Sequence, residues 1–351
     1  MHIDYLIVGQ GISGSLLSYY LLQAGANVLV IDECDPASAS RVASGVINPV
    51  TGRRVVTTWM IDELLPFAIN AYDEIGRELG REIAAETSMI NFHTSEQMQS
   101  SWYNRIAEGS EYISNINDVD AYSKHFHVSY GAGLTFPCLQ VDLNLLLQGW
   151  RQRLIDKGCL LEECFDVDKI QISNGGIVYN DVTAEKLIFC NGVNGFDNNY
   201  FRKLPFTLNK GEALIIEIEG LPPSAIYKHG ISLVPIGDNR FWAGSSFDWA
   251  YDHPHPTDAF RADVENALRR WLKLPYKVLE HKAAIRPGSV ERRPFVGLHP
   301  AFPSIGIMNG MGTKGCSLAP YFAHEFAGLL TSGKKINPEA DIARFSKLLR
   351  S

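Results

Sequence analysis

DYLIVGQGISG, at residues 4–14, is the stretch that decides the fold of this chain. The apolar run from Tyr5 to Val8 is typical of a strand buried on both faces, and residues 15–22 predict a helix. Between them, Gly9, Gly11 and Gly14 follow the G-x-G-x-x-G order. These glycines permit a tight turn, a close approach to a pyrophosphate, and close packing of helix on strand. The helix N-terminus then offers free N–H groups to phosphate oxygens.

A second strand and an acidic pair complete this unit. Residues 28–31 form the next apolar run, and Asp32 and Glu33 follow it. Asp32 stands where a carboxylate accepts hydrogen bonds from a ribose diol. Glycine-rich turns are common, so a βαβ unit that binds no nucleotide is the alternative. Strand, glycines, helix, strand and acid in the correct order favour the nucleotide.

Composition limits the class of protein. The 351 residues are 46% hydrophobic and 20% charged, enough for two ordinary domains of ~150 residues each. A formal charge of −7 argues against a broad nucleic-acid surface, although it leaves a local basic groove open. Six cysteines without a C-x-x-C pair predict buried, reduced thiols. No apolar run approaches the ~20 residues of a membrane span, and no signal peptide is recognisable. We therefore expect a cytoplasmic protein.

Patterns along the rest of the chain predict a mixture of helices and strands. Apolar spacing predicts a helix over 58–79, interrupted near Pro66, and an amphipathic helix over 142–157 with Asp142 as its cap. The other expected elements are strands at 159–162, 166–172, 176–179, 185–190, 213–219, 231–235, 240–245 and 277–286, turns at 174–176 and 237–239, and helices at 256–272 and 317–330. The strands after residue 207 predict a second, sheet-based domain.

Two further stretches offer groups for a ligand. Residues 38–49 are small and polar, so the backbone can lie flat against a planar ligand while Ser40 and Arg41 supply donors; a flexible surface loop is the alternative. Arg53 and Arg54 could bind an anion, but exposed arginines are more often only solvated. A strand from Ile305 enters a second glycine-rich turn at 310–315, ahead of the last long helix.

Three segments together resemble the flavin-dependent D-amino-acid oxidase superfamily, most closely its glycine oxidase-like branch. They are residues 4–33 with 40–49, the strand at 186–192, and residues 284–319. The last contains IRPGSVERRPFVG, similar to the family's R-P-x-x-x-D-x-x-P-x-x-G signature, with Glu291 near the place of the usual aspartate. The oxidase module of a bifunctional tRNA-modifying enzyme belongs to the same superfamily and is the main rival.

The resemblance implies FAD as cofactor and an α/β fold. A discontinuous FAD-binding, Rossmann-like domain of the glutathione-reductase type would comprise residues 1–85, 137–205 and 285–351. An antiparallel-sheet α+β substrate domain would comprise 86–136 and 206–284. The cofactor contacts that the resemblance implies are Gly9, Gly11, Ile12, Ser13, Gly14, Asp32, Glu33, Ser40, Arg41, Ser44, Gly45, Ile47, Val167, Asn191, Gly192, Arg286, Gly310, Gly312, Thr313, Lys314 and Gly315.

The implied reaction is hydride transfer from the amine-bearing carbon of a small amine or amino acid to flavin N5, followed by reoxidation by dioxygen or another acceptor. No side-chain base is required, and His253 and His255 lack the acid or cysteine partners of a metal site. Arg286 would bind the substrate carboxylate through its planar fork, unless it is a structural arginine at a strand end. Tyr251, Trp249 and Lys314 are further candidates for substrate contacts.

Two departures from the family pattern leave the function open. Thr313 stands where the family has a second arginine, and Ser232 where it often has a tyrosine. Both changes loosen the amino-acid pocket. Two alternatives therefore stand beside amine oxidation: removal of a carboxymethylamino group from a modified tRNA base, against which the acidic charge balance weighs, and a flavin-binding protein without activity.

Overall fold

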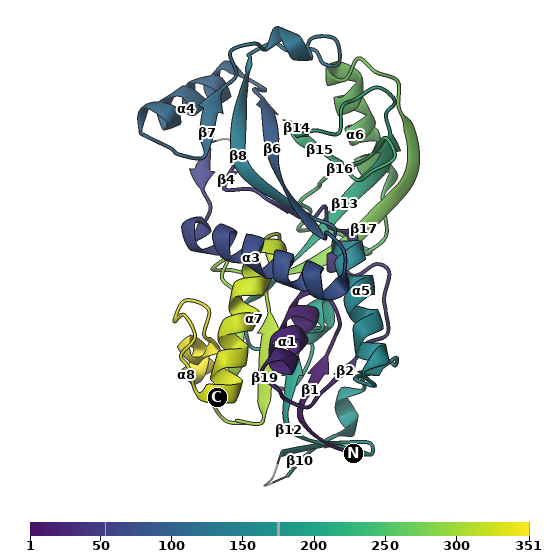
Figure 1. The fold of residues 1–351 in the computed structure, drawn as a ribbon, viewed down its shortest axis with the longest axis vertical. Coiled ribbons are helices and arrows are strands. Elements are labelled where there is room, and N and C mark those ends of the chain that lie inside the picture. Colours follow the sequence, from purple (N-terminus) through teal and green to yellow (C-terminus); the bar gives the residue numbers. More distant parts are fainter. Residues whose placement is uncertain (53, 174–175, 351) are drawn as a thin grey trace.

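Two large β-sheets organise the computed structural model, which describes residues 1–52, 54–173 and 176–350. Figure 1 places the first sheet, with its helices, in the lower half of the molecule and the second sheet in the upper half. Arg53 and residues 174–175 of the turn predicted at 174–176 lie outside the described residues. None of the described helices is long and apolar enough to cross a membrane.

The first sheet is mainly parallel. In space its strands run β9, β2, β1, β12, β19, with β18 antiparallel at one edge and the β10–β11 hairpin beside the start of β12. The bounds are β1 His2–Val8, β2 Val28–Ile31, β9 Leu160–Leu161, β10 Ile170–Ser173, β11 Gly176–Tyr179, β12 Val182–Phe189, β18 Phe295–Leu298 and β19 Ile305–Asn309.

Both faces of this sheet are buried, which explains the continuous apolar runs of its strands. Ile7, Val30 and Ile188 point to one face, where they pack with four helices, α1 Ile12–Gln23, α3 Ile61–Leu79, α5 Leu143–Asp156 and α7 Gly315–Ser332. Leu6 and Phe189 point to the other face, where the C-terminal segment with η4 Ile342–Phe345 and α8 Ser346–Arg350 covers them.

The second sheet is antiparallel except for one pair. Its order is β17-β13-β16-β15-β14-β6-β8-β3, β7 pairs with β8, and β14 runs parallel to β6. The bounds are β3 Val46–Ile47, β6 Ala84–Phe92, β7 Ile113–Asn115, β8 Ala132–Val141, β13 Phe206–Glu217, β14 Ile226–His229, β15 Ile231–Pro235, β16 Arg240–Gly244 and β17 Lys277–Ser289. A parallel sheet covered by helices and a second, largely antiparallel sheet confirm the predicted α/β fold class.

The two faces of the second sheet differ. Helix α6 Asp258–Trp271 packs a full core against one face, with Leu268 and Trp271 among its buried residues. The opposite face carries a smaller apolar cluster that includes Met89, Cys138 and Trp242 and contacts Val46. The remaining elements are α2 Ala39–Val42, β4 Val50–Thr51, β5 Val56–Thr57, α4 Glu96–Ala107, η1 Asp120–Tyr122, η2 Val167–Lys169 and η3 Gly192–Gly195.

The predicted helix starts need correction. Helix α1 begins at Ile12 rather than at residue 15, because the glycine turn runs directly into the helix. Helix α3 begins at Ile61 and continues through Pro66 without interruption. Pro66 lacks the N–H that would bond to the carbonyl of Asp62, and the buried Leu64 and Leu65 fix this part of the helix on the core.

Several predicted strands also differ from the structure. The strand expected over 166–172 begins only at Ile170, because the Asp166 side chain accepts a hydrogen bond from the Asp168 amide at 3.1 Å and holds a 3-10 turn. β13 and β17 are longer than predicted, since each pairs with the other along its whole length. Strands β6, β8, β14 and β18 were not predicted at all. The predicted domain limits fall inside β6, β8 and β17 and stay a prediction.

The cysteines are all free thiols, but only half of them are buried. Cys138, Cys190 and Cys316 are in the interior, as predicted, whereas Cys164 is exposed.

Candidate active site

The parallel strands of the first sheet end at one edge, and a cavity of about 850 Å³ opens there. The residues that follow β1, β2, β12 and β19 line it, together with α2 and the middle of β17. In open α/β sheets, ligands bind outside the carboxyl ends of the strands. The volume lies in the upper part of the ~300–1,000 Å³ typical of small-molecule and cofactor sites.

Many of the predicted site residues meet at this cavity and some do not. Those that line it are Gly9, Gly11, Ile12, Ser13, Asp32, Glu33, Ser40, Arg41, Ser44, Asn191, Gly192, Arg286, Gly312, Thr313 and Gly315. Those that do not are Gly14, Gly45, Ile47, Val167, Tyr251, Gly310 and Lys314. Their roles toward a ligand stay predictions.

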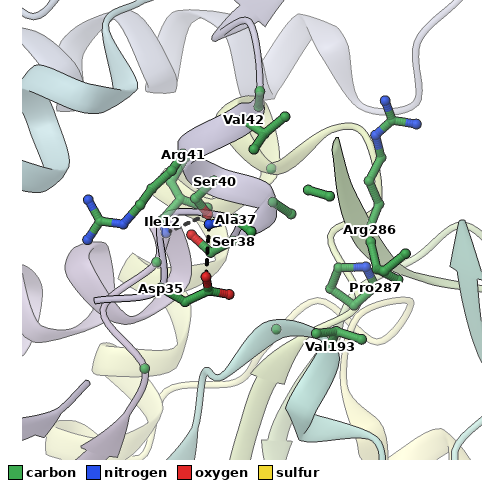
Figure 2. A pocket seen from close by; sticks show the side chains of 18 of the residues that line it. Ile12, Asp35, Ala37, Ser38, Ser40, Arg41, Val42, Val193, Arg286 and Pro287 are labelled. Carbon is green, nitrogen blue, oxygen red and sulfur yellow. Dashed lines mark hydrogen bonds between the residues drawn. The ribbon is translucent and has the colours of Figure 1, made fainter. Parts of the chain in front are cut away.

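The first glycine turn is built as its sequence requires. Gly9 has a φ of +98°, and a Cβ there would lie 2.7 Å from the carbonyl oxygen of Cys190. A Cβ on Gly14 would lie 1.8 Å from the carbonyl oxygen of Gly9, so this glycine allows helix α1 to pack on the turn. Ser40 Oγ accepts a hydrogen bond from the Ile12 amide at 3.0 Å (Figure 2). The amides of Gly11 and Ser13 have no acceptor within the described chain and remain for a ligand.

Asp32 is held by the protein itself. Its carboxylate accepts hydrogen bonds from the amides of Gln10 and Cys34, both at 2.8 Å, and from Arg151 Nη1 at 2.7 Å. The carboxylate therefore closes the glycine turn onto the end of β2. It still lines the cavity, so a contact with a ribose is compatible with these bonds.

Arg151 is a residue of this site that sequence reasoning missed. Besides Asp32, its guanidinium donates to Gln10 Oε1 at 3.2 Å and forms an ion pair with Glu162 at 2.9 Å. Its side chain is only 10% exposed. A signal was present, because Arg151 follows Leu147 by four positions and so shares the apolar face of α5. An arginine on a buried helix face needs an acidic partner.

A loop forms one end of the cavity, and residues 38–44 form part of its lining. Glu163, Cys164 and Phe165 line one end, close in sequence to Val167, which itself lies in the turn η2. Residues 38–44 line the middle, partly as the short helix α2 rather than as the predicted loop. In Figure 2 the guanidinium of Arg41 points away from the side of the cavity where Arg286 lies. Gly45 and Ile47 follow residues 38–44 in the chain but do not line the cavity, and Ile47 is buried.

The second glycine turn connects β19 to helix α7. The Asn309 side chain donates to the carbonyl of Gly192 and accepts from the Gly310 amide, both at 2.8 Å, so it joins the ends of β12 and β19. The Gly312 amide donates to the carbonyl of Pro287 at 2.8 Å. This bond places the N-terminus of α7 beside the strand that carries Arg286.

Arg286 lies on strand β17, and its side chain reaches across to strand β13. Its Nη1 donates to Asn209 Oδ1 at 2.9 Å and to the Ser246 carbonyl at 3.0 Å, and its guanidinium lies 5.0 Å from the centre of the Phe247 ring. None of the described residues accepts a hydrogen bond from its Nε or Nη2. Burial lowers the pKa of Arg286 to about 10, so the group is a cation at neutral pH with donors to spare.

The segment 245–257 forms the rim beside Arg286. Phe247 lines the cavity, but Tyr251 does not. Two contacts anchor the segment: Asp248 exchanges backbone hydrogen bonds with Lys210, and the buried Glu212 carboxylate accepts from the amide and hydroxyl of Thr257 at 2.7 and 2.8 Å. His253 and His255 lie in this segment, and the described residues contain no group of three or more metal-ligating side chains.

Comparison with known proteins identifies the family. The model of the FAD dependent oxidoreductase family, DAO, matches residues 4–329. This chain belongs to that family. The match confirms the resemblance to the D-amino-acid oxidase superfamily and identifies the protein as an FAD-dependent oxidoreductase by family.

Three relatives are distant in sequence but match more than nine-tenths of the chain. The chain is 24% identical to the uncharacterized oxidoreductase YurR of Bacillus subtilis (strain 168), over 93% of this chain and 94% of the relative. Its fold is similar to that of glycine oxidase from Geobacillus kaustophilus, with a TM-score of 0.79, 19% identity and 98% of each chain covered. Iminodiacetate oxidase from Chelativorans sp. BNC1 gives a TM-score of 0.77, 19% identity and 98% of each chain covered.

Proposed function

We propose that the protein binds FAD in this cavity and oxidises the C–N bond of a small amine or amino acid. The observation that carries the proposal is the convergence of two glycine-rich turns with Arg286. One turn follows β1, the other follows β19, and the hydrogen bond from Gly312 to Pro287 connects the second turn to the arginine. The membership of the FAD-dependent family supports the same cofactor.

The cavity fits an extended dinucleotide. A Cβ on Gly11 would lie 3.1 Å from Ser40 Oγ. Because Gly11 has no side chain, ligand atoms can approach its backbone. The free amides of the turn and the N-terminus of α1 suit a pyrophosphate. The buried Asn191 Oδ1 has no donor among the described residues and could be satisfied by a ligand hydroxyl. When bound, FAD supplies the hydride acceptor for the reaction.

The protein's own part in the reaction is positioning. Arg286 would hold the carboxylate of an amino acid through Nε and Nη2, the donors that the protein leaves free. The N-terminus of α7 would stabilise negative charge beside the second glycine turn. Substrate that has lost the hydride and a proton leaves as an imine, which water hydrolyses. Holding the reacting carbon in place accounts for much of such catalysis.

The experiment is anaerobic reduction of the purified protein, which we expect to be yellow, by a panel of substrates. The panel contains glycine, sarcosine, D- and L-amino acids, simple amines, and a carboxymethylamino-modified nucleoside. We expect about one FAD per chain and bleaching of the flavin by at least one amino acid. Bleaching by the nucleoside alone would favour the tRNA reaction. A folded protein that cannot be loaded with FAD, or a flavin that no member reduces, would contradict the proposal.

A further inference from the structure

Strand β13 contains the sequence NKGE at residues 209–212, which lies against Arg286 and the rim segment 245–257. Asn209 is directly opposite Arg286 in the ladder of β13 and β17, so the two side chains share one face of the sheet. Asn209 is only 5% exposed, and neither it nor Gly211 lines the cavity. Any effect of these two residues on a ligand therefore passes through a neighbour.

Asn209 gives the guanidinium a fixed acceptor. Its Oδ1 accepts from Arg286 Nη1 at 2.9 Å, and its Nδ2 donates to the Asp248 carbonyl at 3.0 Å. Because the Nδ2 group has to face that carbonyl, the Oδ1 atom has to face the arginine. Asp248 is itself held by two backbone hydrogen bonds with Lys210, at 2.8 and 3.0 Å. The amide of Asn209 thus has one orientation, and Arg286 has one place to donate to it.

Gly211 gives the guanidinium its space. A Cβ at Gly211 would lie 1.8 Å from Nη2 and 2.0 Å from Cζ of Arg286, so any side chain there would displace the group. The φ angle of Gly211 is not positive, so the strand needs the glycine for room and not for its backbone conformation. With Nη1 bonded and the plane seated on Gly211, the donors Nε and Nη2 stay without an acceptor among the described residues.

We infer that Asn209 and Gly211 are positioning residues for Arg286. They set the place and the angle of its fork, and with them the place of a bound carboxylate and of the carbon that carries the amine. The inference rests on the proposed function for the role of the arginine. A guanidinium binds both oxygens of a carboxylate only in a matched, planar arrangement. A misplacement of ~1 Å can slow a reaction about 100-fold.

The first test measures binding of acetate and of its neutral analogue acetamide to the purified protein, by calorimetry at pH 7. Asn209→Leu and Gly211→Ala both keep the charge of Arg286 and change only its support. Each should bind acetate about tenfold more weakly and acetamide as the wild type does. Asn266→Leu is the control for the first variant, because Asn266 is exposed and accepts from Arg269 at 3.2 Å. Gly328→Ala, whose methyl group would meet the Lys334 side chain, is the control for the second.

The second test separates positioning from a merely structural role. The rate of flavin reduction per bound flavin, at low concentration of the best substrate, is measured in Asn209→Leu, in Arg286→Leu and in the double variant. Asn209→Leu alone should be at least tenfold slower than wild type at full FAD content. Because Asn209 acts through the arginine, the double variant should be no slower than Arg286→Leu. A structural role would slow reduction by the same factor with or without the arginine, and that result would overturn the inference.

The possible results also separate this inference from the proposed function. If amino acids reduce the wild-type flavin but the folded variants bind acetate normally, the positioning role is wrong and the proposed function stands. If acetate binding weakens as expected while no substrate reduces the flavin, the positioning role stands and the proposed function fails. Gly211→Ala keeps both Asn209 and Arg286, so its acetate affinity decides the question if Asn209→Leu does not fold.

Discussion

The two ends of the cavity differ in how far their polar groups are already bonded within the protein. At the first glycine turn, the polar groups are already bonded to one another, as in the Asp32–Arg151 ion pair at 2.7 Å. At the other end, Arg286 lies on β17, far from that turn in the sequence, and its Nε and Nη2 have no acceptor among the described residues. A preorganised end suits a cofactor that stays bound, whereas cations with free donors suit an anion that comes and goes.

Among the variants that test this difference, Arg151→Met is expected to have the largest effect on stability and on FAD affinity. The variant leaves the carboxylate of Asp32 partly buried without its cation, and removing one partner of a buried ion pair costs about 3–5 kcal/mol. We expect a lower free energy of unfolding in urea and a weaker FAD affinity. Arg153→Met is the control, because Arg153 is on the same helix but exposed, with one bond to the Glu78 carbonyl. Equal stability of the two variants would remove Arg151 from the preorganised end.

Gly14→Ala should have the next largest effect. The added methyl group would lie 1.8 Å from a backbone oxygen that cannot move without opening the turn. Overpacking of this kind costs about 1–3 kcal/mol, and we expect the purified protein to contain much less FAD. Gly328→Ala in helix α7 is the matched control, since its methyl group would meet only the flexible Lys334 side chain at 3.2 Å. Full FAD content in Gly14→Ala would show that the turn tolerates displacement of the helix.

The smallest effect concerns pH and tests the unpaired end. Lys314 has a pKa lowered to about 8 by burial and then by Lys228, so it is a cation below that pH and becomes neutral above it. The affinity for a non-oxidisable carboxylate such as acetate should be constant at lower pH and fall as pH rises through about 8. Because Arg286, with a pKa of about 10, stays a cation there, the loss should level off above that range rather than continue. Lys314→Met should flatten the profile, and an unchanged profile in that variant would exclude Lys314 as the titrating group.

The contrast between the two ends also explains how much could be predicted from sequence. The first glycine turn was recognisable because its residues lie within one strand–turn–helix unit, with spacing fixed by local geometry. Arg151 was missed because its partner is far away in the chain, although its place on the apolar face of α5 was a usable signal. Strand β14 was missed because it is four residues long and flanked by turn residues.

The central claim is that Arg286 acts on the substrate while the first glycine turn holds the cofactor. Arg286→Leu tests it, with the rate of flavin reduction measured per bound flavin and with the best substrate of the panel. Loss of a buried partner for a carboxylate costs about 2–5 kcal/mol. At low substrate concentration this predicts reduction roughly 30-fold to several thousand-fold slower.

FAD content should be nearly unchanged in Arg286→Leu, and Arg286→Lys should fall between wild type and Leu because it keeps the charge and loses the fork. Arg240→Leu, at an exposed position of the same sheet, controls for loss of positive charge. Slow reduction at full FAD content is the predicted result. A normal rate per bound flavin, together with poor folding or poor FAD retention, would show that Arg286 is structural and would contradict the account.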